Sequence, residues 1–356
     1  MIIVAPMLRG DYEGFSCAFA CPASSCLQPI VSMDTLSRLL DLADLQLLLD
    51  LRCRLEGAFV IDHDLATPGV VHFHLVLGGQ CSIRTAAGRL VTMRSGDFLM
   101  LPRGDAHSIV SVQSERSDQP PRVLQITDDG LLPMRTNGGG PWDVDLLCGR
   151  FTYAPDSPSL LLDTLPDIFH TSLTTTESDE TLKALVTLLR HEVALALPGS
   201  LTVATALCLA LFVLALRAND NKTLDAPGLP ALLADQRLGR AIKAFVAEPA
   251  RPWTIEQLAA LAAMSRATFA RRFRDRSAMT IGTFLRDFRM SVASRLMQTT
   301  RRSFAEIAAD VGYHSEVSFA KAFKASRQAT PAQFRRSLSV WKTRTSSANP
   351  APSVEP

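Results

Sequence analysis

The sequence predicts an α+β protein in which an N-terminal β-barrel with flanking helices precedes an all-α C-terminal domain. Between about residues 53 and 153, short segments such as VVHFHLVL (70–77) alternate in polarity and are separated by glycine-containing turns, as expected for a small barrel or sandwich. From there to about residue 340, apolar residues recur with helical periodicity. The length of 356 residues leaves room for about two domains.

Shifts in pattern and composition divide the chain. MDTLSRLLDLADLQ (33–46) is the first clear amphipathic helix, with Leu36, Leu39, Leu40 and Leu47 on or near one stripe. Met33 is therefore a candidate natural start. RANDNKTLDAPGLP (217–230) is polar and rich in turn formers, which indicates a linker. The predicted parts are a leader (1–32), an N-terminal domain (33–220), a linker (221–236), a C-terminal domain (237–340) and a disordered tail (341–356).

Two further helices are expected before the linker, at 179–197 and 201–216. The second, LTVATALCLALFVLAL, carries no charge but is short for a membrane span, so we expect a buried or subunit-interface helix and no membrane partner. The N-terminus lacks the pattern of a secretion signal. The seven cysteines show no zinc-like pairing, which favours reduced thiols in the cytoplasm.

Charge is distributed unevenly along the chain. Residues 237–344 hold 21 Lys and Arg against 7 Asp and Glu, a net charge of +14, whereas the remainder holds 16 against 28, a net charge of −12. A basic domain attached to an acidic body is typical of nucleic-acid-binding proteins. The alternative is that two oppositely charged domains simply attract each other.

The basic region contains one pattern twice. WTIEQLAALAAMSRATFARRF (253–273) and SFAEIAADVGYHSEVSFAKAFK (303–324) each predict two helices and a tight turn. Capping boxes are expected at Thr254 with Gln257 and at Ser303 with Glu306, and Ile255, Leu258, Ala259 and Leu261 are expected to form the apolar side of the first helix. Two phenylalanines four residues apart anchor the second helix of each unit: Phe269 and Phe273, then Phe319 and Phe323.

A single helix, 281–298, is expected to connect the two units. Its length would be about 27 Å at 1.5 Å per residue. Two recognition helices held at that separation could enter successive major grooves, which lie about 34 Å apart along one face of DNA. The duplication would thus allow one chain to read two turns of an asymmetric site, although a helix-turn-helix can also be plain packing.

The stretch DVGYHSEVSFAKAFK followed by ATPAQFRR resembles the signature of the AraC/XylS family of transcription regulators, and the resemblance spans about 237–337. It implies sequence-specific binding to double-stranded promoter DNA, with RNA polymerase as a further partner. Gln328 and Ala278 depart from the glycines that are usual at the corresponding turns. By motif position, the expected base-reading residues are Ala267, Ala270, Arg271, Glu316, Val317, Ser318 and Lys321. The expected phosphate contacts are Ser265, Arg266, Arg272, Arg274, Ser315 and Lys324.

The N-terminal domain resembles a cupin-type sensor. GDFLMLPRGDAH (96–107) has the spacing of the second cupin motif, and HFH (72–74) resembles the start of the first. His72, His74 and His107 are therefore candidate effector-binding residues. Because Gly78 and Gly79 replace the usual glutamate, we expect no metal and no cofactor. Three histidines could still bind a metal, and Asp62 and His63 lie nearby in the sequence.

Cys53 and Cys148 fall at opposite ends of the predicted strand region. They are either small buried side chains or thiols that sense oxidants or electrophiles. The sequence does not decide between these roles.

Together these features predict a transcription regulator of the AraC family that is not an enzyme. We expect an unknown small-molecule or redox effector to act on the cupin-like domain and the helices of that domain to form a homodimer. The alternatives are a cupin metal-dependent dioxygenase or isomerase with an appended DNA-binding domain and, more remotely, a nonspecific nucleoid-type DNA binder.

Overall fold

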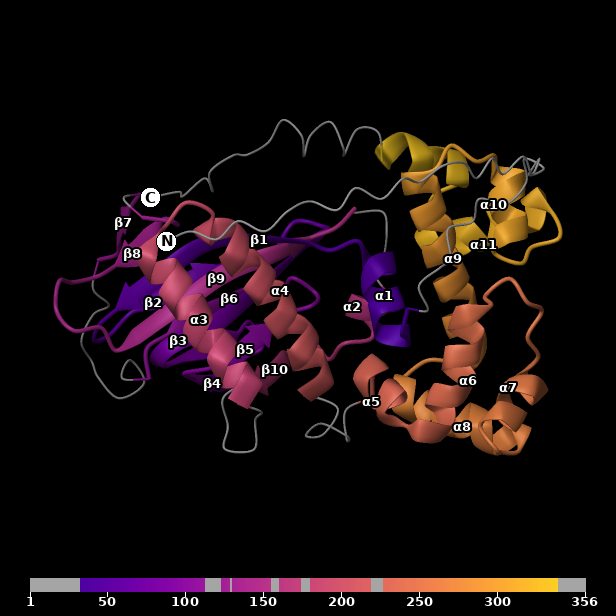
Figure 1. Cartoon of the computed structure of the whole chain (residues 1–356), viewed down its shortest axis with the longest axis horizontal. Helices are drawn as coiled ribbons and strands as arrows, with labels where there is room; N and C mark the ends of the chain where they lie inside the picture. The colour runs from indigo at the N-terminus through magenta and orange to yellow at the C-terminus, as the bar shows by residue number, and fades with distance from the viewer. Residues whose placement is uncertain are drawn as a thin grey trace, which may run out of the picture. The chain divides into compact units, whose positions relative to one another are not determined.

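The computed structural model describes residues 33–112, 123–128, 130–154, 160–173, 180–218 and 227–338. The predicted leader and tail lie outside these residues. A β-rich N-terminal part and a helical C-terminal part are both present, as predicted (Figure 1). From Asp34 onward the described chain forms one compact unit.

Ten strands form a single sheet system in the N-terminal domain. The longest path runs β10-β5-β3-β9-β1-β8-β7, while β2, β4 and β6 complete the barrel through pairing of β4 and β6 with β3 and of β2 with β6. The strands are β1 (Gln46–Leu55), β2 (Val60–His63), β3 (Val70–Thr85), β4 (Leu90–Arg94), β5 (Asp97–Met100), β6 (His107–Val110), β7 (Gln125–Thr127), β8 (Met134–Thr136), β9 (Val144–Thr152) and β10 (Phe169–Ser172).

Strand β3 has the central place in this sheet. It pairs with β5 and β9 through its first half and with β4 and β6 through its second half. Successive side chains of a strand point to opposite faces. Phe73 and Leu75 accordingly belong to the core beneath the helices, whereas Val76 belongs to the core inside the barrel.

Helices α3 (Glu180–Leu195) and α4 (Ser200–Ala218) pack against each other and lie across one face of the sheet (Figure 1). Helix α4 is long and apolar enough to cross a membrane by composition alone. Its Cys208, Leu211 and Phe212 are nevertheless buried against the sheet. The predicted buried helix is therefore confirmed for the side of α4 that faces the sheet.

A buried ion pair ties α3 to the barrel. Arg52 donates to both carboxylate oxygens of Asp145 at 2.8 and 2.6 Å and to the Val193 carbonyl of α3 at 3.3 Å. Burying two charges is tolerated when they are paired and hydrogen-bonded in this way. Removal of either partner would leave an unpaired charge inside the protein.

The first amphipathic helix is shorter than predicted. Helix α1 (Thr35–Ala43) begins at the Asp34 cap and ends at Asp44, which has a left-handed backbone (φ 48°). Leu47 was assigned to the helical stripe, which is wrong: it is the second residue of β1 and pairs with Phe151 of β9. Leucines suit either element, so the backbone turn at Asp44 was the missing signal.

The C-terminal domain consists of helices throughout. They are α5 (Leu229–Ala234), α6 (Gln236–Ala247), α7 (Ile255–Leu261), α8 (Arg266–Ser277), α9 (Ile281–Thr299), α10 (Phe304–Asp310) and α11 (Glu316–Arg327), and residues 331–338 are also helical. The predicted connecting helix is confirmed as α9. Part of the predicted linker is wrong, because α5 and the start of α6 occupy 229–236.

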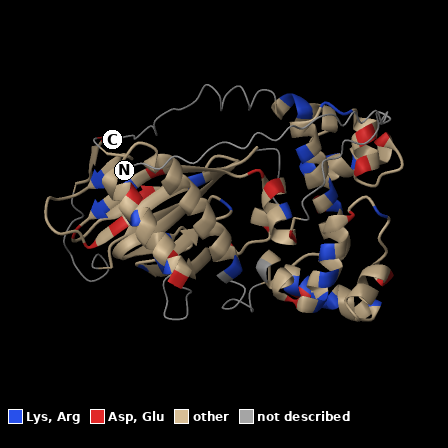
Figure 2. Ribbon diagram, in the orientation of Figure 1, with Lys and Arg blue, Asp and Glu red and all other residues tan. Residues whose placement is uncertain are grey.

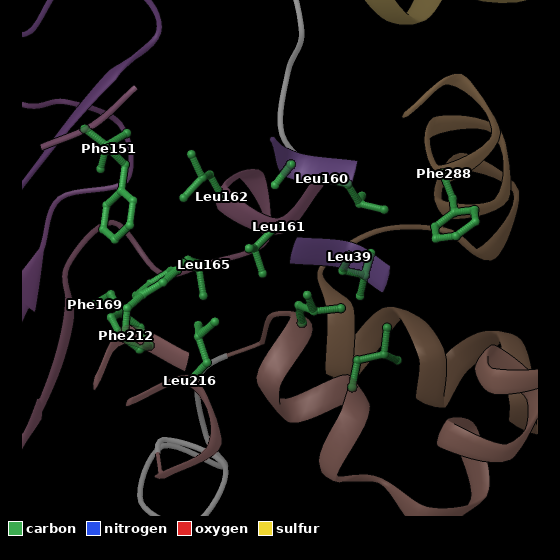
Figure 3. Close-up of a cluster of buried hydrophobic side chains, with 14 of the residues drawn as sticks. Leu39, Phe151, Leu160, Leu161, Leu162, Leu165, Phe169, Phe212, Leu216 and Phe288 are labelled. Atoms are coloured by element: carbon green, nitrogen blue, oxygen red, sulfur yellow. The ribbon is translucent and has the colours of Figure 1, made fainter. Parts of the chain in front are cut away.

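Buried leucines join the two domains. Leu39 of α1 and Leu160, Leu161 and Leu162 of α2 (Leu160–Asp163) belong to one apolar cluster with Phe288 of α9 (Figure 3). Ion pairs reinforce this contact on the side of α1. Arg295 of α9 donates to Asp44 at 2.6 Å and to Asp41 at 3.1 Å. The connecting helix of the C-terminal domain is thus attached to the first helix of the N-terminal domain.

Two helices of the C-terminal domain end in a strained backbone. Ala278 after α8 and Gln328 after α11 both adopt left-handed conformations, with φ of 61° and 57°. Glycine is preferred at such ends because a Cβ atom is crowded there. Ala278 and Gln328, which stand where glycine is usual, therefore keep the turn geometry, and their left-handed backbone lowers the stability of the fold.

We expect Gln328→Gly to raise the free energy of unfolding by about 1 kcal/mol, because it relieves left-handed strain at a helix end. The urea midpoint of the full chain, followed by circular dichroism, measures the effect. Ala325→Gly is the matched control: it introduces glycine inside α11, where it should lower stability by about 1 kcal/mol. A lower midpoint for both variants would show that Gln328 is not strained.

Candidate functional site

The first repeated unit has the predicted helix-turn-helix architecture. Thr254 and Gln257 form a capping box at the start of α7, and Ser265 caps α8 by accepting from the Thr268 amide. Phe269 and Phe273 are fully buried, as predicted. The assignment of Leu261 to the apolar side is wrong. This residue is 41% exposed, because the buried face of the helix runs through Leu258, Ala259 and Ala262 and Leu261 lies outside it.

The second unit repeats this arrangement. Ser303 and Glu306 form the capping box of α10, and Ser315 caps α11. Phe319 and Phe323 are buried like their counterparts. Gly312 has φ of 84°, and a Cβ atom there would lie 2.4 Å from the Ala250 carbonyl oxygen. Glycine is therefore required at this turn by both conformation and space.

The burial of the phenylalanines determines which residues of α8 and α11 face outward. Of the expected base-reading residues, Ala270 is half-buried and the others are exposed: Ala267, Arg271, Glu316, Val317, Ser318 and Lys321. Val317 is 66% exposed. An apolar side chain in that place can contact a thymine methyl group.

The exposed cations fall into two groups. Within the described residues, Arg271 and Arg274 of α8 and Lys321 and Lys324 of α11 form no ion pair with a carboxylate, so their charges are available for an external anion. Figure 2 shows Lys and Arg along the helices of this domain. The nitrogens of Arg266, by contrast, lie 2.9 Å from Glu256.

Arg272, one of the expected phosphate contacts, also has a carboxylate partner. Its Nε donates to Asp235 at 2.6 Å, and the Asp235 carboxylate, only 3% exposed, also caps the start of α6. The hydrogen bond from Arg272 is the largest favourable influence that holds the Asp235 pKa below its usual range, against burial, which raises it. Arg272 thus connects α8 to α6 through a partner 37 residues away, which no local pattern indicates.

A second candidate site lies inside the barrel. His74 and His107 meet there with their Nε2 atoms 2.8 Å apart, and Nδ1 of His107 donates to the Asp105 carbonyl at 2.9 Å. His63 stacks on His107 with ring centroids 4.7 Å apart. His72 lies at the margin, with its ring centroid 6.3 Å from that of His107.

His63 was noted in the sequence only as a neighbour of the expected trio, and the structure brings it into the cluster. The expected trio was His72, His74 and His107, but the three histidines whose ring nitrogens all lie within 4.8 Å are His63, His74 and His107. The antiparallel pairing of β2 with β6 places His63 directly opposite His107. That register depends on tertiary pairing, so no local motif could have revealed it.

All four barrel histidines are held in the neutral form. Burial is the main cause: it lowers the pKa of His63 to about 3 and that of His72 to about 4, and it also lowers the pKa values of His74 and His107. Their mutual repulsion when charged adds to the effect for His63, His72 and His74. Neutral imidazoles are the form that binds metals or accepts hydrogen bonds.

The predicted thiol pair lies against this cluster. Cys148 Sγ is 3.2 Å from Nδ1 of His74, and the Cys148 thiol is also hydrogen-bonded to Cys53. Both cysteines are buried, with exposures of 0% and 5%. The hydrogen bond to Cys53 and burial raise the pKa of Cys148 well above its usual range. The two cysteines are therefore adjacent, and the Cys148 thiol is held protonated.

The comparisons with known proteins match the two parts separately. A cupin family model matches residues 34–219, and a helix-turn-helix domain model matches residues 258–337. These ranges contain the histidine cluster and the two recognition helices, respectively.

Three curated relatives match most of the chain. A helix-turn-helix transcriptional regulator of Haemophilus influenzae is 33% identical over 86% of this chain and all of its own length. The transcriptional regulator MtrA of Neisseria gonorrhoeae is 30% identical over 85% of this chain and 98% of its own. The "RCS-specific" transcriptional activator RclR of Escherichia coli is 28% identical over 85% and 97%.

The fold, the duplicated helix-turn-helix units and these full-length relatives all indicate the same family. The chain therefore belongs to the AraC family of helix-turn-helix transcription regulators and carries an N-terminal cupin domain.

Proposed function

We propose that this regulator reads promoter DNA with α8 and α11 and that a signal received inside the cupin barrel controls it. The observation that supports this most strongly is the group of unpaired cations on the exposed faces of the two recognition helices. Arg271 and Lys321 occupy equivalent places in the two units and would reach base edges. Arg274 and Lys324 would contact phosphates, which position a protein without specifying sequence.

The connecting helix α9 sets the distance between the recognition helices α8 and α11. Helix α9 has 19 residues, so its length is about 28 Å. This length suits recognition helices in successive major grooves of one DNA face. The other expected contacts follow from exposure: Ala267, Ala270, Glu316, Val317 and Ser318 toward bases, and Ser265 and Ser315 toward phosphates. We propose structural roles for Arg266 and Arg272, because each is already paired with a carboxylate.

Signal reception is assigned to the barrel cluster, defined here as His63, His72, His74, His107, Cys53 and Cys148. These side chains come from five strands and contact one another in the barrel interior. A ligand or a chemical change at one of them would therefore move its neighbours. The proposed route outward uses the contacts that Arg295 of α9 makes with Asp41 and Asp44. A signal would then act by shifting the population between arrangements of the recognition helices. Catalysis is not part of this proposal.

The remaining partners follow from the same proposal. Regulation of promoters implies contact with RNA polymerase and a place in the cytoplasm. A homodimer is supported by apolar side chains on the outer faces of α3, α4 and the loop between them. Of the fourteen large hydrophobic side chains that are exposed among the described residues, six fall within 22 residues: Leu188, Leu195, Leu197, Leu201, Val203 and Leu209. An apolar patch of this kind marks an interaction surface, and a second copy of the chain is the proposed occupant.

Specificity should depend on Arg271 but not on Arg274. On a promoter found by genome-wide mapping of bound sites, Arg271→Ala should cost about 1–3 kcal/mol of binding free energy and relax base preference at its position. Arg274→Ala should weaken binding to the promoter and to scrambled DNA alike, because phosphates are the same in both.

Arg272→Ala is the matched control on the same helix, and it should alter stability more than base preference. Equal losses on both DNAs for Arg271→Ala would refute its role as a base reader. Equal affinity of the wild type for the promoter and scrambled DNA would favour the nonspecific binder.

The dimer surface can be tested by charge. Leu201→Lys combined with Leu209→Lys should convert a dimer of twice 38.7 kDa to monomer, because two charges would be desolvated in an apolar interface. Light scattering coupled to size exclusion measures the mass. Leu65→Lys, at an exposed site in the loop after β2, should leave the mass unchanged. A double variant that stays dimeric would place the interface elsewhere.

Thiol sensing has its own test. We expect a mild oxidant to change promoter affinity of the wild type and to leave the Cys53→Ser, Cys148→Ser variant unaffected, because Cys148 contacts both Cys53 and His74. The response should be slow, since the hydrogen bond to Cys53 and burial keep the Cys148 thiol protonated, and a protonated thiol is a poor nucleophile. Cys208→Ser, buried on α4, is the control and should respond like the wild type. Identical responses of the wild type and the double variant would favour a ligand in the barrel instead.

A further inference from the structure

The hydrogen bonds of the barrel cluster fix where its protons are. A carbonyl oxygen only accepts, so the hydrogen bond to Asp105 requires a proton on Nδ1 of His107. The Nε2 of a neutral His107 then carries a lone pair. His74 Nε2 must donate to it across 2.8 Å, which leaves Nδ1 of His74 to accept from the Cys148 thiol.

This chain of bonds satisfies His74 and His107 but leaves His63 without a partner. The Nε2 atom of His63 is buried and has no hydrogen-bond partner among the described residues. A buried polar atom that lacks a partner destabilises the folded protein. Its stacking on His107 holds it beside the other two rings rather than toward solvent. An unpartnered nitrogen next to two paired ones is what a missing shared ligand would leave.

We propose that His63, His74 and His107 form a binding site for one late first-row divalent transition metal, with Zn²⁺ as the reference ion. Their three ring nitrogens lie within 4.8 Å of one another. Zinc–nitrogen bonds of about 2.0–2.1 Å in a tetrahedron place ligand nitrogens roughly 3.4 Å apart. Small side-chain rotations are therefore enough to bring the three nitrogens onto one ion.

The surroundings suit a histidine-bound metal. The Asp105 carbonyl holds the outer nitrogen of His107, and the Cys148 sulfur contacts the outer nitrogen of His74. Partners of this kind orient metal-binding imidazoles. A metal on Nε2 of His74 would require the other tautomer of that ring: its proton would move from Nε2 to Nδ1, where the Cys148 sulfur would accept it. The metal would take the lone pairs of Nε2 of His107 and of His63. Three imidazoles leave a fourth position open for a further ligand.

The donor set differs from the one that the sequence suggested. His72 lies two residues from His74 on β3 but outside the group whose nitrogens converge. His63 of β2 takes its place. The two histidines are therefore a matched pair: both are barrel residues with pKa values lowered by burial, and the proposal assigns a ligand role to only one of them.

Metal binding can be measured on the purified full chain without DNA, so its failure leaves the proposed DNA recognition untouched. After chelation and desalting, the wild type should take up one equivalent of Zn²⁺ and melt at a higher temperature. Co²⁺ in place of Zn²⁺ should give the intense visible absorption of a tetrahedral site. His63→Ala should weaken Zn²⁺ binding by at least the 10–100-fold that loss of an outer-shell partner costs, whereas His72→Ala should change it little.

Two outcomes would overturn the proposal. One is a wild type that binds less than one equivalent of Zn²⁺ and shows only the weak absorption of hydrated Co²⁺. The other is an equal loss of affinity in His72→Ala and His63→Ala, which would assign the metal to a different set of histidines. Because the Co²⁺ spectrum is taken on the wild type, the first outcome does not depend on whether a variant folds.

Discussion

The architecture of the N-terminal domain depends on the alternation of side chains along β3. This strand belongs to both halves of the barrel, so its pleat decides what enters the interior and what meets α3 and α4. Phe73 and Leu75 form a core with the helices on one side, while His74 enters the barrel on the other. A slip of one residue would exchange these sets and place imidazoles beneath the apolar helices. The same register that stabilises the fold therefore creates the polar centre.

In the C-terminal domain, packing and DNA contact use opposite sides of the recognition helices. Each recognition helix has two buried phenylalanines on one side, so the opposite side is not needed for packing. Charges that are needed for stability find carboxylates at its margins, as Arg272 does with Asp235. Arg271, Arg274, Lys321 and Lys324 form no ion pair with a carboxylate among the described residues. Function is therefore concentrated where packing makes no demand on the side chain.

Local signals in the sequence were sufficient for much of this structure. Capping boxes, paired phenylalanines and the length of α9 are set by residues a few positions apart, and all were predicted correctly. The failures came from the backbone or from distant pairing. Asp44 ended α1 before Leu47, α5 formed within an apparent linker, and the pairing of β2 with β6 brought His63 to His107. Without that pairing His63 could not be placed beside His107, and the contact of Arg272 with Asp235 likewise depends on the packing of helices that are distant in the sequence.

The attachment of α9 to α1 has a thermodynamic consequence. Helix α9 connects the two recognition helices, and its Arg295 binds Asp41 and Asp44 of the cupin domain. A structural change in the cupin domain would therefore alter the recognition helices, and the reverse also holds. Coupling of this kind is reciprocal, since the free energy that links two binding events is the same in either direction. If occupancy of the barrel changes the affinity for an operator tenfold, the operator changes the affinity of the barrel tenfold as well. Promoter DNA would thereby act as an effector of the sensor.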